Sequence, residues 1–118
     1  MHVARWVDDM VALVARDEAR ALVRYLGEVG FAVRAYATPD AAHGAQTLIW
    51  VTEPGSGDLA TARAVCAWLG ASLRARAIVV SARPTSLRAA IDDGRVWLLP
   101  APASGRELAD ALRDMEPR

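Results

Sequence analysis

The stretch Met10-Val-Ala-Leu-Val-Ala-Arg-Asp-Glu18 decides how this chain folds, because it is a short apolar run that ends abruptly in charge. Residues 11–15 have no polar atom in any side chain, and the run is too short to cross a membrane. Such a run predicts a strand that is buried on both faces, as the strands of a parallel sheet are. Ligand-binding groups gather at the carboxyl ends of such strands, so Asp17 is the first candidate for a functional site.

The rest of the chain repeats this alternation of strand and helix. Further strands are predicted at residues 31–37, 47–52, 77–81 and 96–99. The helices between them are predicted to run from an Asp17 N-cap to Val29, from Thr38 to about Gly44, from an Asp58 N-cap to Gly70, from Pro84 to Gly94, and from a Ser104/Glu107 capping box onward. Alternation of this kind implies parallel pairing with right-handed crossovers. We therefore expect a three-layer α/β sandwich with a five-stranded sheet of order 2-1-3-4-5, the flavodoxin-like arrangement.

Inside the third helix, Leu59, Ala62, Val65, Cys66 and Leu69 are predicted to form the inner face. Residues 1–9 allow two interpretations: an amino-terminal extension that packs Trp6 on the sheet, or a first strand that ends in Asp8 and Asp9. The extension is preferred because the run at 11–15 is more apolar. In either case residues 1–118 are interpreted as a single domain.

The composition excludes several classes of function. The chain has 14 basic and 14 acidic residues and no formal net charge, which argues against a nucleic-acid-binding protein. All of the basic residues are Arg, so Schiff-base chemistry and a Walker-type phosphate lysine are both excluded. The single cysteine, Cys66, is expected to pack in the core and allows neither an intrachain disulfide nor a thiolate metal cluster. Neither a signal peptide nor a long apolar span is visible, and the expected compartment is the cytoplasm.

Four motifs follow the predicted strands in order. They are Asp17-Glu18 after the first strand, Pro54-Gly55 after the third, Ser81-Ala82 after the fourth, and the ungapped stretch from Gly94 to Leu108 around the fifth. In order and spacing they resemble the motifs of response-regulator receiver domains, the phospho-accepting modules of two-component signalling. The resemblance spans about residues 10 to 116 and implies the same flavodoxin-like fold.

The departures from the receiver pattern concern its chemistry. The family holds Mg²⁺ with two acids after strand one, and the first of that pair is here Arg16. The family's phospho-accepting Asp at the end of strand three is here Thr52, or Trp50 when counted back from Pro54. The family's Lys before the proline after strand five is here Ala101. One hypothesis is that the Arg16 guanidinium takes the place of the metal and pairs with Asp17 or Glu53; the alternative is that Arg16 points into solvent.

These losses predict a pseudo-receiver, which acts in signalling through protein–protein contact without being phosphorylated. Its degenerate phosphorylation pocket consists of Arg16, Asp17, Glu18, Thr52, Glu53, Ser81 and Ala101. No catalytic residue, metal or cofactor is expected. The resemblance also implies a contact surface on the fourth helix, fifth strand and last helix, where family members commonly pair as homodimers; its residues would be Leu87, Ile91, Trp97, Leu98, Leu108 and Leu112. The expected partner is another protein or a second copy, with no nucleic acid and no membrane.

Two alternatives stay open at the level of sequence. The chain could be a small α/β enzyme or ligand-binding domain that uses the strand ends near Asp17, Glu53, Ser81 and Arg83. It could also be a receiver-like piece of a larger transcriptional regulator whose output domain is absent here. A ligand-binding domain should have a concave pocket with convergent polar groups, whereas an interaction module should have a filled pocket and an apolar surface elsewhere.

Overall fold

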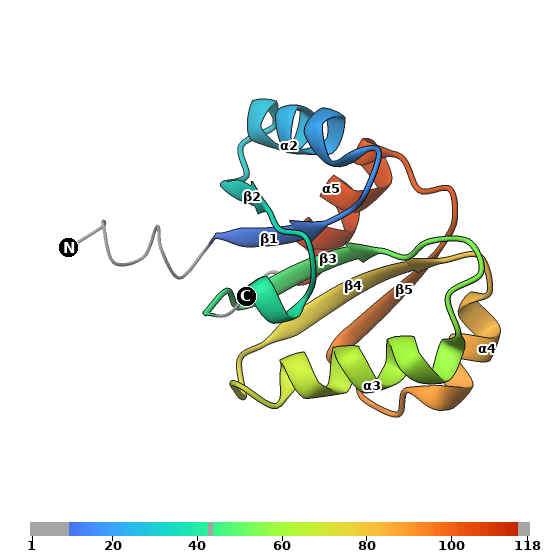
Figure 1. Cartoon of the computed structure of the whole chain (residues 1–118). Helices are drawn as coiled ribbons and strands as arrows, with labels where there is room; N and C mark the ends of the chain where they lie inside the picture. Colours follow the sequence, from blue (N-terminus) through green and yellow to red (C-terminus); the bar gives the residue numbers. More distant parts are fainter. Residues whose placement is uncertain (1–9, 43, 116–118) are drawn as a thin grey trace.

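The sheet at the centre of the molecule has five parallel strands, seen in a computed structural model that describes residues 10–42 and 44–115 (Figure 1). The strands are β1 (Val11–Val14), β2 (Val33–Ala35), β3 (Thr47–Val51), β4 (Arg76–Ser81) and β5 (Val96–Pro100). Their order is β2-β1-β3-β4-β5. This arrangement confirms the predicted three-layer α/β fold and its strand order.

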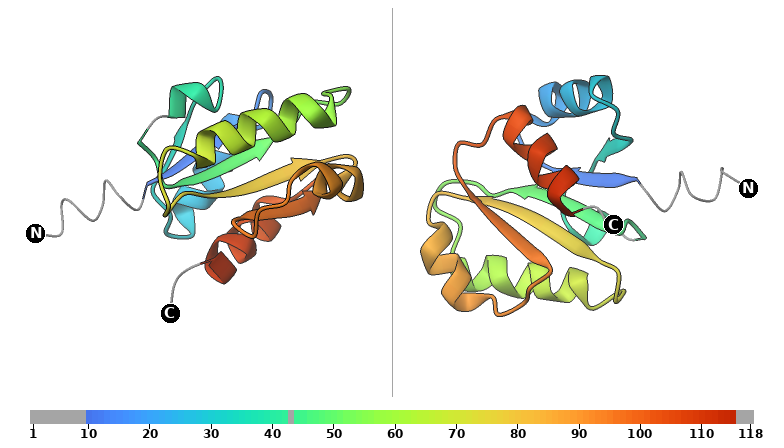
Figure 2. Two further views of the ribbon diagram at one scale, coloured as in Figure 1. Left: turned by 90° about the horizontal axis from the view of Figure 1, so that it is seen from below. Right: turned by 180° about the vertical axis from the view of Figure 1, so that it is seen from behind.

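Helices cover both faces of the sheet. In the described residues they are α2 (Ala19–Glu28), α3 (Asp58–Leu69), α4 (Pro84–Ala90) and α5 (Gly105–Met115), with one 3₁₀ turn, η1 (Asp40–Ala42). Helices α2 and α5 lie on one face, and α3 and α4 lie on the other (Figure 2). No helix in this part of the chain is both long enough and apolar enough to cross a membrane.

Strand β1 lies at the middle of this arrangement, as its apolar run predicted. Val11 pairs with Val33 of β2 on one side and with Thr47 of β3 on the other, and residues 11–15 are all buried. Alternate side chains enter opposite halves of the core: Ala12 and Val14 pack on the α3 side, and Leu13 packs on the α2 side. The preferred position of the first strand is thus confirmed, while Trp6, Asp8 and Asp9 lie outside the described residues.

The predicted helix ends are only partly right. The N-cap of α2 is Glu18 rather than Asp17, and it makes no capping hydrogen bond through its side chain. Asp58 is the first residue of α3 and Gly57 precedes it as the cap. A carboxylate is also favourable inside the first turn of a helix, which explains the error of one residue at Asp58.

Two further elements are shorter than predicted. The expected helix after Thr38 is reduced to the turn η1, although the Thr38 hydroxyl does accept a hydrogen bond from the Ala41 amide at 3.3 Å. Helix α4 ends at Ala90 because Ile91 takes an extended conformation and turns into the core. By contrast, the capping box of α5 is confirmed: the Ser104 amide donates to Glu107 Oε1 at 3.0 Å, and the Glu107 amide donates to Ser104 Oγ at 3.1 Å.

The inner face of α3 is rotated from the predicted one. Leu59 is 60% exposed and Cys66 is also exposed, so both of these core predictions are wrong. Their places are taken by Thr61 and by Trp68, whose indole nitrogen donates to the Ala42 carbonyl at 3.3 Å. Because α3 is apolar around most of its circumference, the apolar spacing alone does not determine which face turns inward.

Candidate functional site

The polar residues that follow β1 and β3 meet at the carboxyl edge of the sheet. Arg16 comes directly after the buried run of β1, and its Nη1 lies 3.3 Å from both carboxylate oxygens of Glu53, which follows β3. Arg16 thus pairs with Glu53, one of the two acids considered, while its side chain also lies largely in solvent. The two side chains are 74% and 52% exposed, so the ion pair adds little to stability, on the order of 0.2–1 kcal/mol. The pair joins the residues that follow β1 and β3 at this edge.

Thr52 is held against the neighbouring strand. Its amide and its hydroxyl both donate to the Val80 carbonyl of β4, at 3.0 and 2.7 Å. The hydroxyl proton is therefore engaged in joining β3 to β4. Neither Thr52 nor Trp50, the two residues expected at the phospho-accepting position, offers a carboxylate at this strand end.

Ser81 and Ala101 lie together at the next strand ends. The Ala101 amide donates to the Ser81 carbonyl at 2.9 Å, and the Ser81 hydroxyl accepts from the Arg83 amide at 3.0 Å. Ser81 is only 7% exposed, so its hydroxyl supports the turn into α4. Neither residue belongs to the wall of the hollow around Arg16.

Five of the seven predicted pocket residues share one open hollow. It has a volume of about 600 Å³ and is lined by Arg16, Asp17, Glu18, Val51, Thr52, Glu53 and Pro54. Asp17 and Glu18 are exposed, and neither forms an ion pair with another described residue. Within residues 10–42 and 44–115, no three His, Cys, Asp or Glu side chains are grouped closely enough to hold a metal ion. Asp17, Glu18 and Glu53 therefore do not form a three-carboxylate group in the described part of the chain.

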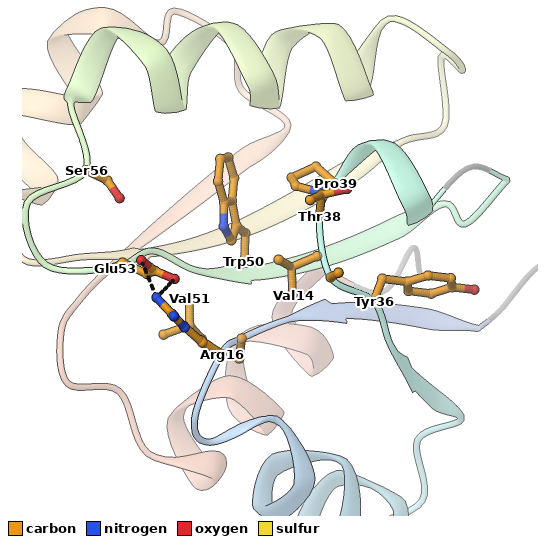
Figure 3. Close-up of a pocket in the computed structure, with 11 residues that line it drawn as sticks. Val14, Arg16, Tyr36, Thr38, Pro39, Trp50, Val51, Glu53 and Ser56 are labelled. Atoms are coloured by element: carbon orange, nitrogen blue, oxygen red, sulfur yellow. Dashed lines mark hydrogen bonds and ion pairs between the residues drawn. The ribbon is translucent and has the colours of Figure 1, made fainter.

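A second hollow lies beside the first and was not predicted from the sequence (Figure 3). It has a volume of about 520 Å³ and is lined by Val14, Ala15, Arg16, Tyr36, Ala37, Thr38, Pro39, Trp50, Val51, Glu53 and Ser56. Arg16, Val51 and Glu53 line both hollows, so the ion pair stands at their border. The one sequence signal for it is Trp50, a large aromatic residue next to the end of a strand.

The predicted contact surface needs correction. Leu87, Ile91, Leu108 and Leu112 are all buried in the core and are not available to a partner. Their spacing on amphipathic helices is the spacing of core residues. Trp97 and Leu98 are half-buried. Trp97 pairs with Ile78 and is the second residue of β5, so it lies near the amino end of that strand.

Comparison with known proteins adds information on the fold. No protein-family model and no curated protein matches the sequence. Among solved structures, the chain is similar to a CheY-like response regulator receiver domain protein from Methanospirillum hungatei, with a TM-score of 0.66, 12% identity, and coverage of 91% of this chain and 92% of that one. It is similar to the receiver domain of the hybrid histidine kinase CckA, with a TM-score of 0.60, 19% identity, and coverage of 89% and 96%.

A third similar structure carries a different name. It is described as an adenylate cyclase from Rhodopirellula baltica, with a TM-score of 0.70, 16% identity, and coverage of 91% of this chain and 86% of that one. At these identities the likeness concerns the path of the backbone. The chain therefore has the flavodoxin-like fold of CheY-like response-regulator receiver domains.

Proposed function

We propose that this chain is a pseudo-receiver: a receiver-like signalling domain that acts through protein–protein contact and is not phosphorylated. The observation that carries the proposal is the Arg16–Glu53 ion pair at the carboxyl edge of the sheet. In the receiver pattern that edge holds a metal ion between carboxylates. Here a permanently charged guanidinium pairs with the Glu53 carboxylate, which is the one that follows β3.

The chemistry of phosphoryl transfer to an aspartate supports the same conclusion. The reaction needs a carboxylate nucleophile, a divalent cation that neutralises the phosphoryl group, and a cation that holds the product. Trp50 and Thr52 supply no carboxylate, and the Thr52 hydroxyl is bound to the Val80 carbonyl. The sequence contains no Lys, and Ala101 stands at the position of the family's lysine.

A signalling domain without this chemistry must transmit its state by contact. We place the contact surface on the exposed residues of α4, β5 and α5, because the four leucine and isoleucine residues first considered are in the core. Thr85 and Ala89 on α4 and Arg106 and Asp110 on α5 are exposed, and Leu98 of β5 is half-buried. The partner is another protein or a second copy of this chain.

The proposal is tested by incubating the protein with acetyl phosphate and Mg²⁺ and measuring its intact mass. A receiver domain that keeps its acidic pair, aspartate and lysine serves as the positive control. We expect the control to gain the mass of one phosphoryl group while this chain keeps its original mass. A phosphoryl adduct on this chain that disappears in an Asp17→Asn or Glu53→Gln variant would show that the pocket still accepts a phosphoryl group, and would contradict the proposal.

A further inference from the structure

We propose that the hollow beside Trp50 is a binding site for a small, uncharged, planar heteroaromatic molecule. The hollow lies between the carboxyl ends of β1 and β3 and the segment that follows β2 (Figure 3). In the order β2-β1-β3-β4-β5, the chain runs outward to β2 and then crosses to β3, so the direction of winding reverses between β1 and β3. This is the switch point at which open α/β sheets bind their ligands. The inference does not depend on whether the chain is phosphorylated.

The size and lining of this hollow suit a small molecule. Its volume of about 520 Å³ falls within the range of about 300–1,000 Å³ that is typical of ligand sites. Val14, Pro39 and the ring of Trp50 form apolar walls, and Arg16 and Glu53 form a polar one. A cavity that combines apolar walls with a few polar groups is the usual construction of a site that binds a ring and orients its polar edge.

Trp50 supplies the surface on which a planar ring can stack. Its side chain stands in the hollow between Ser56 and the corner formed by Thr38 and Pro39 (Figure 3). Trp50 is half-buried, and its indole nitrogen has no hydrogen-bond partner in the part of the chain that the structure describes. Because no buried side-chain nitrogen there lacks a partner, this nitrogen must reach solvent. Trp50 therefore offers both an aromatic face and a free N–H donor.

The charges around the hollow define which ring it suits. Arg16 is already neutralised by Glu53, so the pair presents donors and acceptors side by side without a net charge. The Thr38 hydroxyl accepts from the Ala41 amide and keeps its proton for donation, and the Ser56 hydroxyl faces the same space. A phosphate group would meet the Glu53 carboxylate, whereas an uncharged heterocycle with both donor and acceptor atoms meets complementary groups.

The test uses the uniformly ¹⁵N-labelled protein and two uncharged probes, adenosine and riboflavin, with the indole N–H signals as readout. We expect at least one probe to shift the Trp50 signal in a saturable way. Trp68 is the internal reference, because its indole N–H is bound to the Ala42 carbonyl and its side chain is buried. If neither probe shifts the Trp50 signal up to its solubility limit, or if Trp50 and Trp68 shift equally, the proposal is wrong.

Two variants test whether the probes bind in the hollow beside Trp50. Trp50→Ala removes the stacking surface and should weaken binding by about tenfold, the change that corresponds to one aromatic pair. Because Trp50→Ala also removes part of the core, Ser56→Tyr provides a second test: residue 56 is exposed on a loop that lines the hollow, so a large side chain there obstructs the hollow without replacing a core residue. We expect Ser56→Tyr to abolish the shift while the protein stays folded. Unchanged probe affinity in the folded Ser56→Tyr variant would overturn the proposal.

Discussion

Gly105 offers a sharp test of how α2 and α5 pack together. It is the first residue of α5 and lies against the ring of Tyr25 on α2. A Cβ atom at this position would lie 2.6 Å from Tyr25 Cδ2 and 3.0 Å from Cγ. Carbon atoms pack best at about 3.5–4.0 Å, so in Gly105→Ala either the ring or the start of α5 must move.

The expected size of the effect follows from two opposing terms. Introducing a methyl group into a packed site costs about 1–3 kcal/mol. Replacing a helical glycine by alanine gains at most about 1 kcal/mol, and less at the first position of a helix. Steric crowding should win, so we expect the free energy of unfolding of Gly105→Ala to be about 1–2 kcal/mol lower than that of the parent protein.

Gly27 on α2 is the matched control. It lies within the helix, and a Cβ atom there would meet no other atom within 4 Å. Gly27→Ala should therefore raise the free energy of unfolding by about 0.5–1 kcal/mol. Both variants are measured by urea unfolding followed by far-ultraviolet circular dichroism. If Gly105→Ala is as stable as the parent protein or more so, the close approach of Gly105 to Tyr25 is wrong.

Three further predictions concern individual hydrogen bonds of the fold. Thr52→Val keeps the shape of the side chain but removes the bond to the Val80 carbonyl, so urea unfolding should show a loss of about 1 kcal/mol; no loss would mean that the hydroxyl is free. Ser104→Ala removes the cap of α5 and should cost about 1 kcal/mol in thermal unfolding, and an unchanged midpoint would contradict the capping box. Hydrogen bonds from Arg95 lower the pKa of Asp93, so this carboxylate stabilises the fold above its unfolded pKa near 3.8 and loses that contribution as the pH falls through its lowered folded pKa. Stability measured against pH should fall less steeply below pH 3.8 in Asp93→Asn than in the parent protein, and identical slopes would argue against the pair.

The architecture was predictable because local signals agreed with one another. The run at residues 11–15 has no polar atom, and only a central strand of a parallel sheet buries both of its faces in this way. The Ser104/Glu107 box was equally readable, because its two hydrogen bonds join residues three apart in the sequence. Signals of this kind are local and need no knowledge of the rest of the fold.

The sequence-based predictions were wrong where packing against the sheet determines which side of a helix turns inward. Helix α3 is apolar on most sides, so only contact with the sheet decides that Trp68 turns inward and that Cys66 faces solvent. Leu87 and Leu112 were assigned to a contact surface by resemblance, although their helical spacing already marked them as core. A surface transferred from a family therefore needs to be checked against the amphipathic pattern of each helix.

The candidate site was predicted in part. Pairing of Arg16 with Glu53 was one of the possibilities that the sequence offered, because both residues stand at strand ends that meet at one edge. The Trp50 hollow was missed because its wall combines three segments, the ends of β1 and β3 and the residues that follow β2, which are distant in the sequence. No spacing rule within a single segment brings those residues together.

The central claim is that the carboxyl edge of this sheet has lost the metal site of a receiver. The most direct test is a Mg²⁺ titration of the ¹⁵N-labelled protein that follows the backbone amide signals of Asp17, Thr52 and Glu53. The account predicts that these signals stay in place up to millimolar Mg²⁺, because Arg16 engages the Glu53 carboxylate and the other acids do not converge. Saturable shifts confined to these three amides would show that the pocket binds the metal, and would contradict the account.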